Sequence, residues 1–282
     1  MSETCQTNGY DTVHAVDFYH SMTQIPGFLQ DAAVYLDGYR KTLQLQTTKK
    51  RPFVVLDVCT GTGRVIRDLV AHLSEHDADL HATKFIGLDI SRPMLDQAAK
   101  LPLASPTADV TWIEGSALNL HEVPAFRDGV LKADLLIVAF SSISHFIEPG
   151  QVAQFLREVA RVLQPGTGRA YISLRDIPAT FQSDMAPAEG DTNSTDLPSL
   201  VLPGITYRQI GNDVQVKDGV VYVVSNVQVM SGKGDTLSTE SATTAFRILG
   251  DDELRTLASS VGLDVMETVK AGEETYYVFQ SP

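Results

Sequence analysis

The sequence predicts an α/β fold in which a doubly wound parallel sheet follows an N-terminal helical segment and carries an antiparallel β insertion. Two patterns predict this fold class. From Pro52 to Leu174, short apolar runs alternate with amphipathic helical patterns, as expected for strands buried on both faces and joined by crossover helices. From residue 177 to 248, apolar runs are separated by turn residues instead, which is typical of antiparallel strands.

Composition excludes several classes of function. The chain has 282 residues and a net charge of −13, so no nucleic-acid partner is expected, because a duplex-binding surface needs concentrated positive charge. The first thirty residues lack the basic start and apolar stretch of a signal peptide, and no apolar run approaches the ~20 residues that span a bilayer. With only two cysteines, Cys5 and Cys59, we expect a soluble cytoplasmic protein with no membrane partner.

Two helices are predicted before the sheet begins. A short one covers Thr12 to Met22, and a second lies within Phe28 to Leu43, where apolar residues recur at intervals of three and four. The polar stretch QTTKKRP then ends in a proline before the first β-branched run. We expect residues 1–50 to form a helical lid and the core to begin at residue 51.

The predicted core contains five strands with helices between them. The strands are FVVLDV, KFIGLDI, VTWIEG, ADLLIVAF and AYISL. Helical patterns cover Ile66 to Leu73, Met94 to Lys100 and Val152 to Leu163, and QPGTG ends the last of them. Together with a C-terminal helix and hairpin, the core is expected to comprise residues 51–176 and 249–282.

Residues 177–248 are predicted to hold a mobile loop and then the antiparallel insertion. The loop is rich in proline, acidic and small polar residues. Hairpin turns are expected at Gly211-Asn212, at Asp218-Gly219 and in SGKGD. After the insertion, Asp251 is predicted to cap a helix that Gly262 ends, and LDVMETV and TYYVFQ to pair as a terminal hairpin.

The segment VVLDVCTGTGR is the most informative part of the sequence, because a buried strand runs into a glycine turn and then into an amphipathic helix. Gly61 and Gly63 allow backbone conformations and a close approach that a side chain would prevent. Such a turn brings backbone N–H groups and a helix N-terminus up to a nucleotide-like ligand. Ile66 stands where a dinucleotide fingerprint needs its third glycine, and no Gly-Lys-Ser or Gly-Lys-Thr follows. Both common phosphate-binding motifs are therefore disfavoured.

The end of the next strand strengthens the case for a ligand. Asp89 lies 26 residues beyond Gly63, and a carboxylate there can accept hydrogen bonds from both hydroxyls of a ribose. Ser91 is a candidate helix cap, and Met94 in the first turn can lie over a base. A lone Asp89 would indicate a solvated strand end, but its coupling to the glycine turn favours a bound ligand.

At these residues the chain resembles the class I S-adenosylmethionine-dependent methyltransferases, whose core is Rossmann-like. The family's first motif matches Asp57, Gly61 and Gly63, with Cys59 where the first glycine usually stands. The family's ribose-binding acid matches Asp89. The stretches ADLLIVAFSSISHF and RVLQPGTGRAYISL are similar to the family's fourth strand, the helix after it and the fifth strand.

The resemblance implies an S-adenosylmethionine cofactor bound where these strands end. In IEGSALNL, Ser116 stands where the family frequently has an adenine-binding aspartate. The cofactor-binding residues that the resemblance implies are Asp57, Cys59, Thr60, Gly61, Gly63, Asp89, Ile90, Met94, Gly115, Ser116, Ala117 and Phe140.

The resemblance also implies an enzyme, a methyltransferase that presents an activated methyl group to an acceptor for in-line displacement, which depends on proximity and orientation. By analogy with small-molecule members of the family, we expect a small organic acceptor, methylated at oxygen, as in secondary-metabolite biosynthesis. The loop and insertion at residues 177–248 are expected to cover the acceptor pocket.

Four residues are candidates for the acceptor's side of the reaction. His145, after the fourth strand, can orient or deprotonate an acceptor, and Arg175, at the end of the fifth, can hold an anionic one. Both are candidate catalytic and substrate-binding residues, and Tyr10 and Tyr19 in the predicted lid are candidate substrate-binding residues. Each has a structural alternative: a loop hydrogen bond for His145, a pair with Asp176 for Arg175, and helix packing for the tyrosines.

Two other functions stay open. The same fold can bind the cofactor and catalyse a rearrangement or cyclisation without methyl transfer, or act as a non-catalytic binding protein. Stoichiometric formation of S-adenosylhomocysteine would separate methyl transfer from both. The histidines at 14, 72, 76, 81 and 121 lack metal-ligand spacing, so they are expected on the surface and no metal is expected. The acceptor, the use of a general base and the formation of a homodimer are left open by the sequence.

Overall fold

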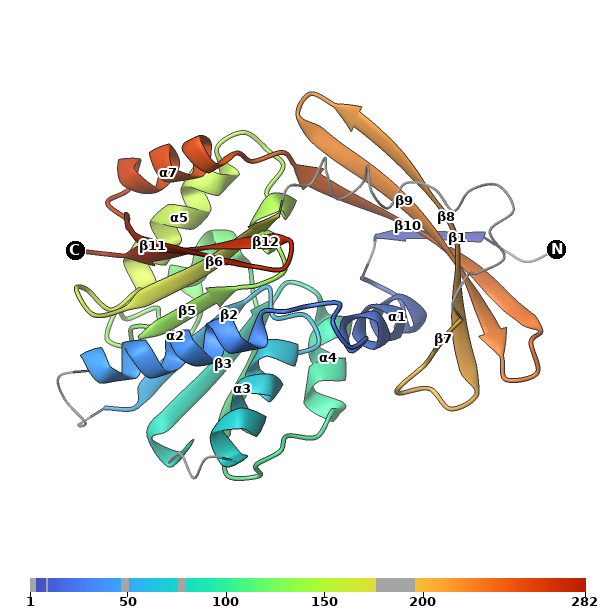
Figure 1. The fold of residues 1–282 in the computed structure, drawn as a ribbon, viewed down its shortest axis with the longest axis horizontal. Coiled ribbons are helices and arrows are strands. Elements are labelled where there is room, and N and C mark those ends of the chain that lie inside the picture. The colour runs from blue at the N-terminus through green and yellow to red at the C-terminus, as the bar shows by residue number, and fades with distance from the viewer. Residues whose placement is uncertain (1–3, 9, 47–50, 76–79, 176–195) are drawn as a thin grey trace. The chain divides into compact units, whose positions relative to one another are not determined.

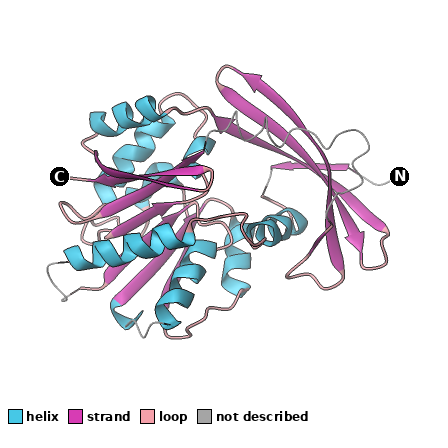
Figure 2. Cartoon of the chain, in the orientation of Figure 1, coloured by secondary structure: helices cyan, strands magenta, loops and turns pink. Residues whose placement is uncertain are grey.

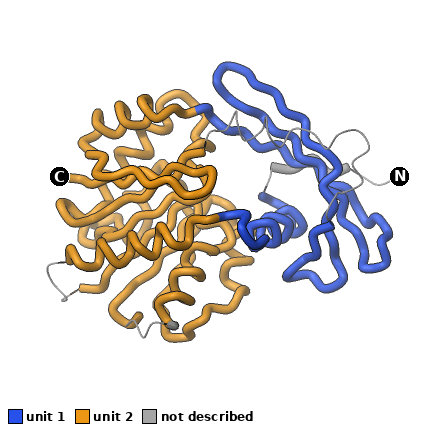
Figure 3. Tube along the Cα trace, viewed as in Figure 1, with its two compact units in different colours: residues 1–29, 176–248 blue, residues 30–175, 249–282 orange. Residues whose placement is uncertain are grey.

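The computed structural model describes residues 4–8, 10–46, 51–75, 80–175 and 196–282 (Figure 1). The chain divides into two compact units (Figure 3), a smaller one of residues 1–29 and 176–248 and a larger one of residues 30–175 and 249–282. Both N-terminal helices were predicted to share one segment that ends at residue 50, whereas each unit takes one of them. Most of the predicted mobile loop, up to residue 195, lies outside the described residues.

The larger unit is built on a seven-stranded sheet with the strand order β11-β12-β6-β5-β2-β3-β4. Figure 2 shows the strands in magenta and the helices in cyan. Its parallel strands are β2 (Phe53–Val58), β3 (Thr83–Asp89), β4 (Asp109–Glu114), β5 (Leu135–Val138) and β6 (Arg169–Arg175). All residues of β2 and β5 are buried, which is why they read as continuous apolar runs in the sequence. The predicted doubly wound parallel sheet is confirmed.

Helices cover both faces of this sheet. One face carries α2 (Ala32–Leu45) and α3 (Arg64–Glu75), and the other carries η2 (Ala117–Glu122), α5 (Gln151–Val162) and α7 (Asp251–Ser260). Successive residues of β2 show the alternation, because Val55 packs on the face of α2 and α3 and Leu56 packs on the other face. The remaining short elements are η1 (Leu80–Ala82), α4 (Arg92–Lys100) and η3 (Ser142–His145).

The strand order reverses between β2 and β5. β2 pairs with β3 on one side and with β5 on the other, and both pairings are parallel. The chain therefore builds β3 and β4 outward on one side before it crosses to β5 and β6 on the other. In open α/β sheets, ligands bind outside the carboxyl ends of the strands at such a switch point. The residues that follow β2 and β5 are thus the ones placed for a ligand.

The C-terminal hairpin extends the sheet and confirms another prediction. It consists of β11 (Asp264–Ala271) and β12 (Glu274–Gln280), which pair antiparallel. β12 also pairs antiparallel with β6, and Glu274 lies opposite Arg175. Because the two strands run in opposite directions, the first residue of β12 lies at the edge where the parallel strands end.

The helix before this hairpin differs from the prediction at its start. Gly250, not Asp251, is the N-cap of α7, and no side chain caps it. Asp251 lies in the first turn, where a carboxylate is favourable to the helix dipole, and pairs with Arg255 at 2.9 Å. At the other end, Gly262 has a φ of 82°, as expected for the residue that ends a helix.

Among its described residues, the smaller unit has a five-stranded sheet and one helix. The strands, in spatial order, are β1 (Thr4–Asn8), β10 (Thr236–Arg247), β9 (Val220–Ser231), β8 (Ile205–Lys217) and β7 (Leu197–Pro198). All of the pairings are antiparallel except that of β1 with β10. The predicted antiparallel insertion after the fifth core strand is confirmed, and the N-terminal strand β1 was not predicted.

One predicted hairpin turn in this unit is wrong. Gly211 and Asn212 lie within the single strand β8, where the register with β9 shifts between Gln209 and Gly211. A β-bulge therefore uses the glycine, which is one of the two meanings that an isolated glycine has in a strand pattern. The turn at Asp218-Gly219 is confirmed, since both residues have a positive φ, as a two-residue hairpin requires.

The first predicted helix, α1 (Val13–Thr23), belongs to the smaller unit. Thr12 caps it by accepting a hydrogen bond from the Ala15 N–H group at 3.0 Å, and the same hydroxyl donates to Glu240 on β10. Across the described part of the chain, no helix combines the length and the apolarity that crossing a bilayer requires.

Candidate functional site

The turn after β2 has the left-handed backbone that its glycines predict. Gly61 and Gly63 have φ values of 55° and 76°, and Cys59 has one of 58°. The Thr60 N–H group donates to the Leu88 carbonyl oxygen at 2.9 Å, which ties the turn to the end of β3. Burial raises the pKa of the Cys59 thiol, as do the carboxylates of Asp89 and Asp57. The thiol is therefore protonated at neutral pH and is not a nucleophile.

Packing inside the protein accounts for the glycine at position 63. A Cβ atom there would lie 2.3 Å from the Trp112 ring of β4, and one at Gly87 would lie 2.4 Å from the same ring. The tryptophan lies across two glycines that belong to neighbouring strands and turns. The group that approaches the backbone closely at Gly63 is therefore the Trp112 side chain.

Asp57, the last acid of β2, keeps one carboxylate oxygen without a partner. The residue is 1% exposed, and Thr60 Oγ1 donates to its Oδ2 at 2.5 Å. Its Oδ1 is buried and has no hydrogen-bond partner among the described residues. Burial raises the pKa of Asp57 to about 7, against the lowering effects of the Thr60 hydroxyl and the Arg64 guanidinium. Such an oxygen suits a cationic hydrogen-bond donor.

Asp89, at the end of β3, is fixed by two backbone N–H groups. Gly61 donates to Oδ2 at 2.8 Å and Ser91 donates to Oδ1 at 2.9 Å. Burial raises the pKa of this carboxyl, and hydrogen bonds from the backbone of Ser91, Gly61 and Ile90 oppose the rise. Each oxygen keeps a lone pair for a further donor. The carboxylate is thereby aligned before any ligand arrives.

The residues after Asp89 include two apolar side chains and a helix cap. Ser91 caps α4 through the Met94 N–H group, as predicted. Met94 is buried, whereas Ile90 is 75% exposed. After β4, the Gly115 N–H group donates to the Asp89 carbonyl oxygen at 2.9 Å. Ser116 caps η2, which begins at Ala117.

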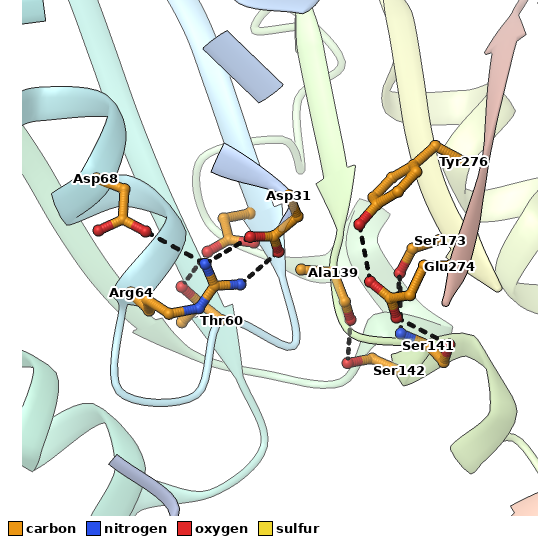
Figure 4. Close-up of polar contacts among 11 residues, drawn as sticks. Asp31, Thr60, Arg64, Asp68, Ala139, Ser141, Ser142, Ser173, Glu274 and Tyr276 are labelled. Atoms are coloured by element: carbon orange, nitrogen blue, oxygen red, sulfur yellow. Dashed lines mark hydrogen bonds and ion pairs between the residues drawn. The ribbon is translucent and has the colours of Figure 1, made fainter. Parts of the chain in front are cut away.

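A buried ion pair that the sequence patterns did not indicate supports the glycine turn. Arg64, the first residue of α3, binds Asp31 with two hydrogen bonds of 2.8 and 2.5 Å. Asp31 is 1% exposed and is the N-cap residue of α2. The one available signal was an arginine at a helix N-terminus, where the dipole disfavours a cation. Figure 4 shows this pair together with a second network, around Glu274, at the same strand edge.

The second network surrounds the turn that follows β5. Phe140 and Ser141 are both left-handed, with φ values of 52° and 53°. The hydroxyls of Ser141 and Ser173 donate to one oxygen of Glu274, and the Tyr276 hydroxyl donates to the other. No sequence pattern indicated Glu274, because an acid after a glycine at the start of a strand is normally a solvated turn residue.

Comparison with known proteins shows what the core of the larger unit is similar to. A model of the family described as methyltransferase domain matches residues 55–166. The N-methyltransferase FrzE of Cladobotryum sp is 36% identical over 167 residues, which cover 58% of this chain and 57% of that relative. The demethylmenaquinone methyltransferase of Lactiplantibacillus plantarum is 34% identical over 113 residues, 40% of this chain and 41% of its own length. The chain thus spans only about half the length of the curated relatives it matches.

Solved structures show the same fold over nearly the whole chain. An S-adenosylmethionine-dependent methyltransferase from Clostridium acetobutylicum has a TM-score of 0.68 at 15% identity, over 94% of this chain and 97% of its own. The sugar N-methyltransferase KedS8 from Streptoalloteichus sp also has a TM-score of 0.68 at 15% identity, over 100% of this chain and 97% of its own. These structures show the fold, and the family match shows that residues 55–166 form a methyltransferase domain. S-adenosylmethionine, the cofactor expected from the sequence, is the cofactor named for the Clostridium protein.

The residues near the ends of the parallel strands fit S-adenosylmethionine. The buried polar atoms that lack partners within the described residues include Asp57 Oδ1 on β2 and the hydroxyl of Tyr35 on α2. Tyr35 is 1% exposed, and burial together with the charge of Asp31 raises its pKa. A ligand that carries an ammonium group and a carboxylate can donate a hydrogen bond to Asp57 Oδ1 and accept one from the Tyr35 hydroxyl. Exposed Ile90 offers an apolar surface for a base.

The candidate acceptor residues of the larger unit lie near the same strand ends. His145 ends η3, directly after β5, and is half-buried. Arg175 ends β6, lies 5.2 Å from the Phe140 ring centroid and pairs with Glu273 at 3.6 Å. Its alternative partner, Asp176, lies outside the described residues.

The tyrosine candidates belong to the smaller unit, which also holds a polar network. The rings of Tyr10 and Tyr19 contact edge to face, with centroids 5.6 Å apart. Asp17 on α1, 2% exposed, accepts hydrogen bonds from Tyr207 and Ser199 of 2.6 and 2.5 Å.

His14 on α1 departs from the sequence prediction. Its Nδ1 lies 3.3 Å from the Tyr207 hydroxyl, and the side chain is half-buried rather than a free surface residue. Within the described residues, no group of three or more histidine, cysteine or acidic side chains could hold a metal ion.

Proposed function

We propose that this methyltransferase transfers the methyl group of S-adenosylmethionine to a nitrogen atom of a small organic molecule. The pair of carboxylates that flank the glycine turn, Asp57 and Asp89, carries the cofactor half of the proposal. The acceptor half is supported by the 36% identical relative, which is an N-methyltransferase. Methylation at oxygen, which was expected from the sequence, stays a prediction, as does a role in secondary-metabolite biosynthesis.

The proposed cofactor site assigns a separate task to each carboxylate. The unpartnered oxygen of Asp57 accepts a hydrogen bond from the cofactor's ammonium group, and the aligned carboxylate of Asp89 accepts those of the ribose hydroxyls. When bound, the cofactor supplies a methyl group that its sulfonium has already activated. Carboxylates along this edge favour that cation over the neutral product. The residues proposed to surround the base are Ile90, Met94, Gly115, Ser116 and Ala117.

A nitrogen acceptor needs a neutral lone pair, because a protonated amine cannot attack the methyl group. We therefore assign to His145 the removal of the acceptor's proton. Arg175 is assigned the orientation of an anionic group on the acceptor, since a guanidinium binds such groups with two hydrogen bonds. Tyr10 and Tyr19 stay candidate substrate-binding residues.

Calorimetric titration of S-adenosylmethionine and S-adenosylhomocysteine into the full chain tests the cofactor half. We expect Asp89→Ala to weaken binding by about 1–3 kcal/mol, the scale of lost charge-assisted hydrogen bonds. Asp96→Ala is the matched control, because Asp96 is an exposed acid on α4 that pairs with Arg92. Absence of binding to the folded wild-type chain would overturn the proposal.

Labelled S-adenosylmethionine tests the acceptor half. Amines and alcohols built on the same small scaffolds are compared, with label transfer and S-adenosylhomocysteine measured in parallel. We expect label on the amines, with one S-adenosylhomocysteine formed for each methyl group transferred. Label on the alcohols alone would show that the methylated atom is oxygen and not nitrogen. Label on RNA or protein alone would exclude a small acceptor. Conversion of an acceptor without S-adenosylhomocysteine would favour a rearrangement.

A further inference from the structure

The turn after β5 has a backbone that its residues do not favour. Ala139 O accepts a hydrogen bond from the Ser142 N–H group at 3.1 Å, and the two residues between them, Phe140 and Ser141, both have a left-handed φ. These features define a type I′ turn. Such turns are normally made of asparagine and glycine, because a Cβ atom in this conformation crowds the following carbonyl oxygen. Phe-Ser therefore needs support from elsewhere in the protein.

That support comes from β6 and β12. The Ser141 N–H group donates to Ser173 Oγ at 2.9 Å, and Ser141 Oγ donates to Glu274 Oε1 at 3.1 Å. Ser173 Oγ donates to the same carboxylate oxygen at 3.4 Å, and the Tyr276 hydroxyl donates to Oε2 at 2.9 Å. All four residues are at most 4% exposed. The Arg175 guanidinium lies over the Phe140 ring, 5.2 Å from its centroid.

Glu274 is brought to this turn by topology. β12 runs antiparallel to β6, so that Glu274 lies opposite Arg175 at the carboxyl edge of the sheet. The turn it contacts follows β5, and the glycine turn follows β2, with Asp57 opposite Ile137 in the pairing of those strands. The two turns therefore flank the switch point from opposite sides. Figure 4 shows the Glu274 network beside the residues of the glycine turn.

We infer that Glu274 is a positioning residue for the cofactor site. Its carboxylate holds the Phe140–Ser141 turn in the left-handed conformation through Ser141 and Ser173, and so fixes the backbone that borders the cofactor opposite the glycine turn. Residues held in unfavourable backbone conformations persist only where their surroundings over-determine them, and they cluster at ligand clamps. This role rests on the cofactor half of the proposed function.

The Glu274→Gln variant tests the inference with almost no change in shape. The amide has one acceptor oxygen instead of two, so it cannot serve all three hydroxyl donors as the carboxylate does. We expect the affinity for S-adenosylhomocysteine and the KM for S-adenosylmethionine to worsen about tenfold, the scale of one lost charge-assisted hydrogen bond. The kcat at saturating cofactor stays within a factor of about three, because no residue assigned to the acceptor has changed.

Two substitutions of Ser141 separate positioning from stability. Ser141→Ala and Ser141→Gly remove the same hydroxyl, but glycine adopts a left-handed φ without a steric cost. We expect the alanine variant to bind S-adenosylhomocysteine several-fold more weakly than the glycine variant. In the double variant, adding Ser141→Ala to Glu274→Gln has little further effect on binding, since both substitutions remove the same contact between Ser141 and Glu274. Equal binding by the alanine and glycine variants would overturn the inference.

Glu267→Gln is the matched control on the same hairpin, because Glu267 is exposed and its partner Lys41 lies 3.4 Å away in solvent. It is expected to change neither affinity nor KM. Unchanged cofactor affinity in folded Glu274→Gln, with a wild-type chain that binds, would overturn this inference alone. A wild-type chain that bound no cofactor would overturn it together with the proposed function.

Discussion

The two turns that flank the switch point adopt similar left-handed conformations by different means. After β2, the turn uses Gly61 and Gly63, which have no Cβ atom to crowd the backbone. After β5, the turn uses Phe140 and Ser141, and a buried carboxylate more than 130 residues further along the chain supports it. The first conformation is therefore encoded locally and the second by tertiary contacts.

This difference decides how each turn responds to substitution. A Cβ atom added at a turn glycine destabilises the left-handed backbone of the turn itself, and at Gly63 it also meets the Trp112 ring. A turn held by hydrogen bonds loses its conformation when a distant hydrogen-bond partner is removed, even though the sequence of the turn is unchanged. Substitutions at the glycine turn should thus affect the folded state most, and those around the second turn should have smaller effects on stability.

The largest expected effect is that of Gly63→Ala. The backbone at this position has a φ of 76°, and the new Cβ would lie 2.3 Å from the Trp112 ring, so the left-handed cost and the overpacking add to a loss of about 3–5 kcal/mol. Denaturant unfolding measures it. Gly129→Ala is the matched control, because Gly129 has a φ of 70° and a Cβ added there would meet nothing within 4 Å. Similar losses in the two variants would show that Trp112 plays no part.

The next effect concerns Asp57 and depends on pH. The folded-state pKa of about 7 lies above the ordinary value of 3.8, so the unfolded chain releases this proton first and stability falls as pH rises from about 4 to 7. Asp57→Asn lacks this loss, and we expect it to be more stable than the wild type by about 4 kcal/mol at pH 8 and by little at pH 4. Denaturant unfolding across this pH range measures the difference.

The same substitution, which stabilises the fold, should weaken the binding of the cofactor. Wild-type affinity for S-adenosylhomocysteine is expected to increase as pH rises through about 7, because the ionised carboxylate accepts the ammonium group better. The asparagine variant should bind more weakly and lose that pH dependence. A parallel pH dependence in wild type and variant would show that another group titrates, and would remove Asp57 from the ammonium site.

The larger unit could be predicted from sequence better than the smaller one, for a physical reason. Strands such as β2 are buried on both faces and flanked by amphipathic helices, so hydrophobic patterning identifies them. In β8, Gly211 and Asn212 read as a turn because a glycine in a strand can mark either a turn or a bulge, and only the partner strand decides between them. The division between α1 and α2 depends on packing, which periodicity does not encode.

The candidate site shows the same limit. Gly61 and Asp89 could be predicted because a strand end, a left-handed turn and a helix cap must each use particular residue types nearby. Asp31 and Glu274 could not, because their roles come from contacts with Arg64 and Ser141, which lie far away in the sequence. Acids near a helix start or after a glycine have ordinary solvated roles. Their burial is a property of the assembled sheet.

Ser173→Ala tests the tertiary support of the second turn. It removes the oxygen that accepts the Ser141 N–H group, and an unpaired buried N–H group costs about 1–2 kcal/mol. We expect that loss of stability in denaturant unfolding. Ser260→Ala is a suitable control, because that hydroxyl is exposed and donates to a carbonyl of its own helix. A loss no larger than the control's would mean that the turn keeps its conformation without β6.

The smallest effect is expected at Cys59, where the glycine turn itself holds a left-handed residue with a Cβ atom. Cys59→Gly relieves that cost, which stabilises the protein. It also loses the packing of the thiol against the core and makes the unfolded chain more flexible, which both destabilise the protein. The stability of this variant should therefore lie within about 0.5 kcal/mol of wild type. Cys59→Ala loses the packing without the relief and should be about 1 kcal/mol less stable. Neither should change cofactor affinity, because a protonated thiol offers the ligand little. If alanine proved the more stable of the two, the left-handed backbone would not be what limits this position, and the contrast between the two turns would rest on Gly61 and Gly63 alone.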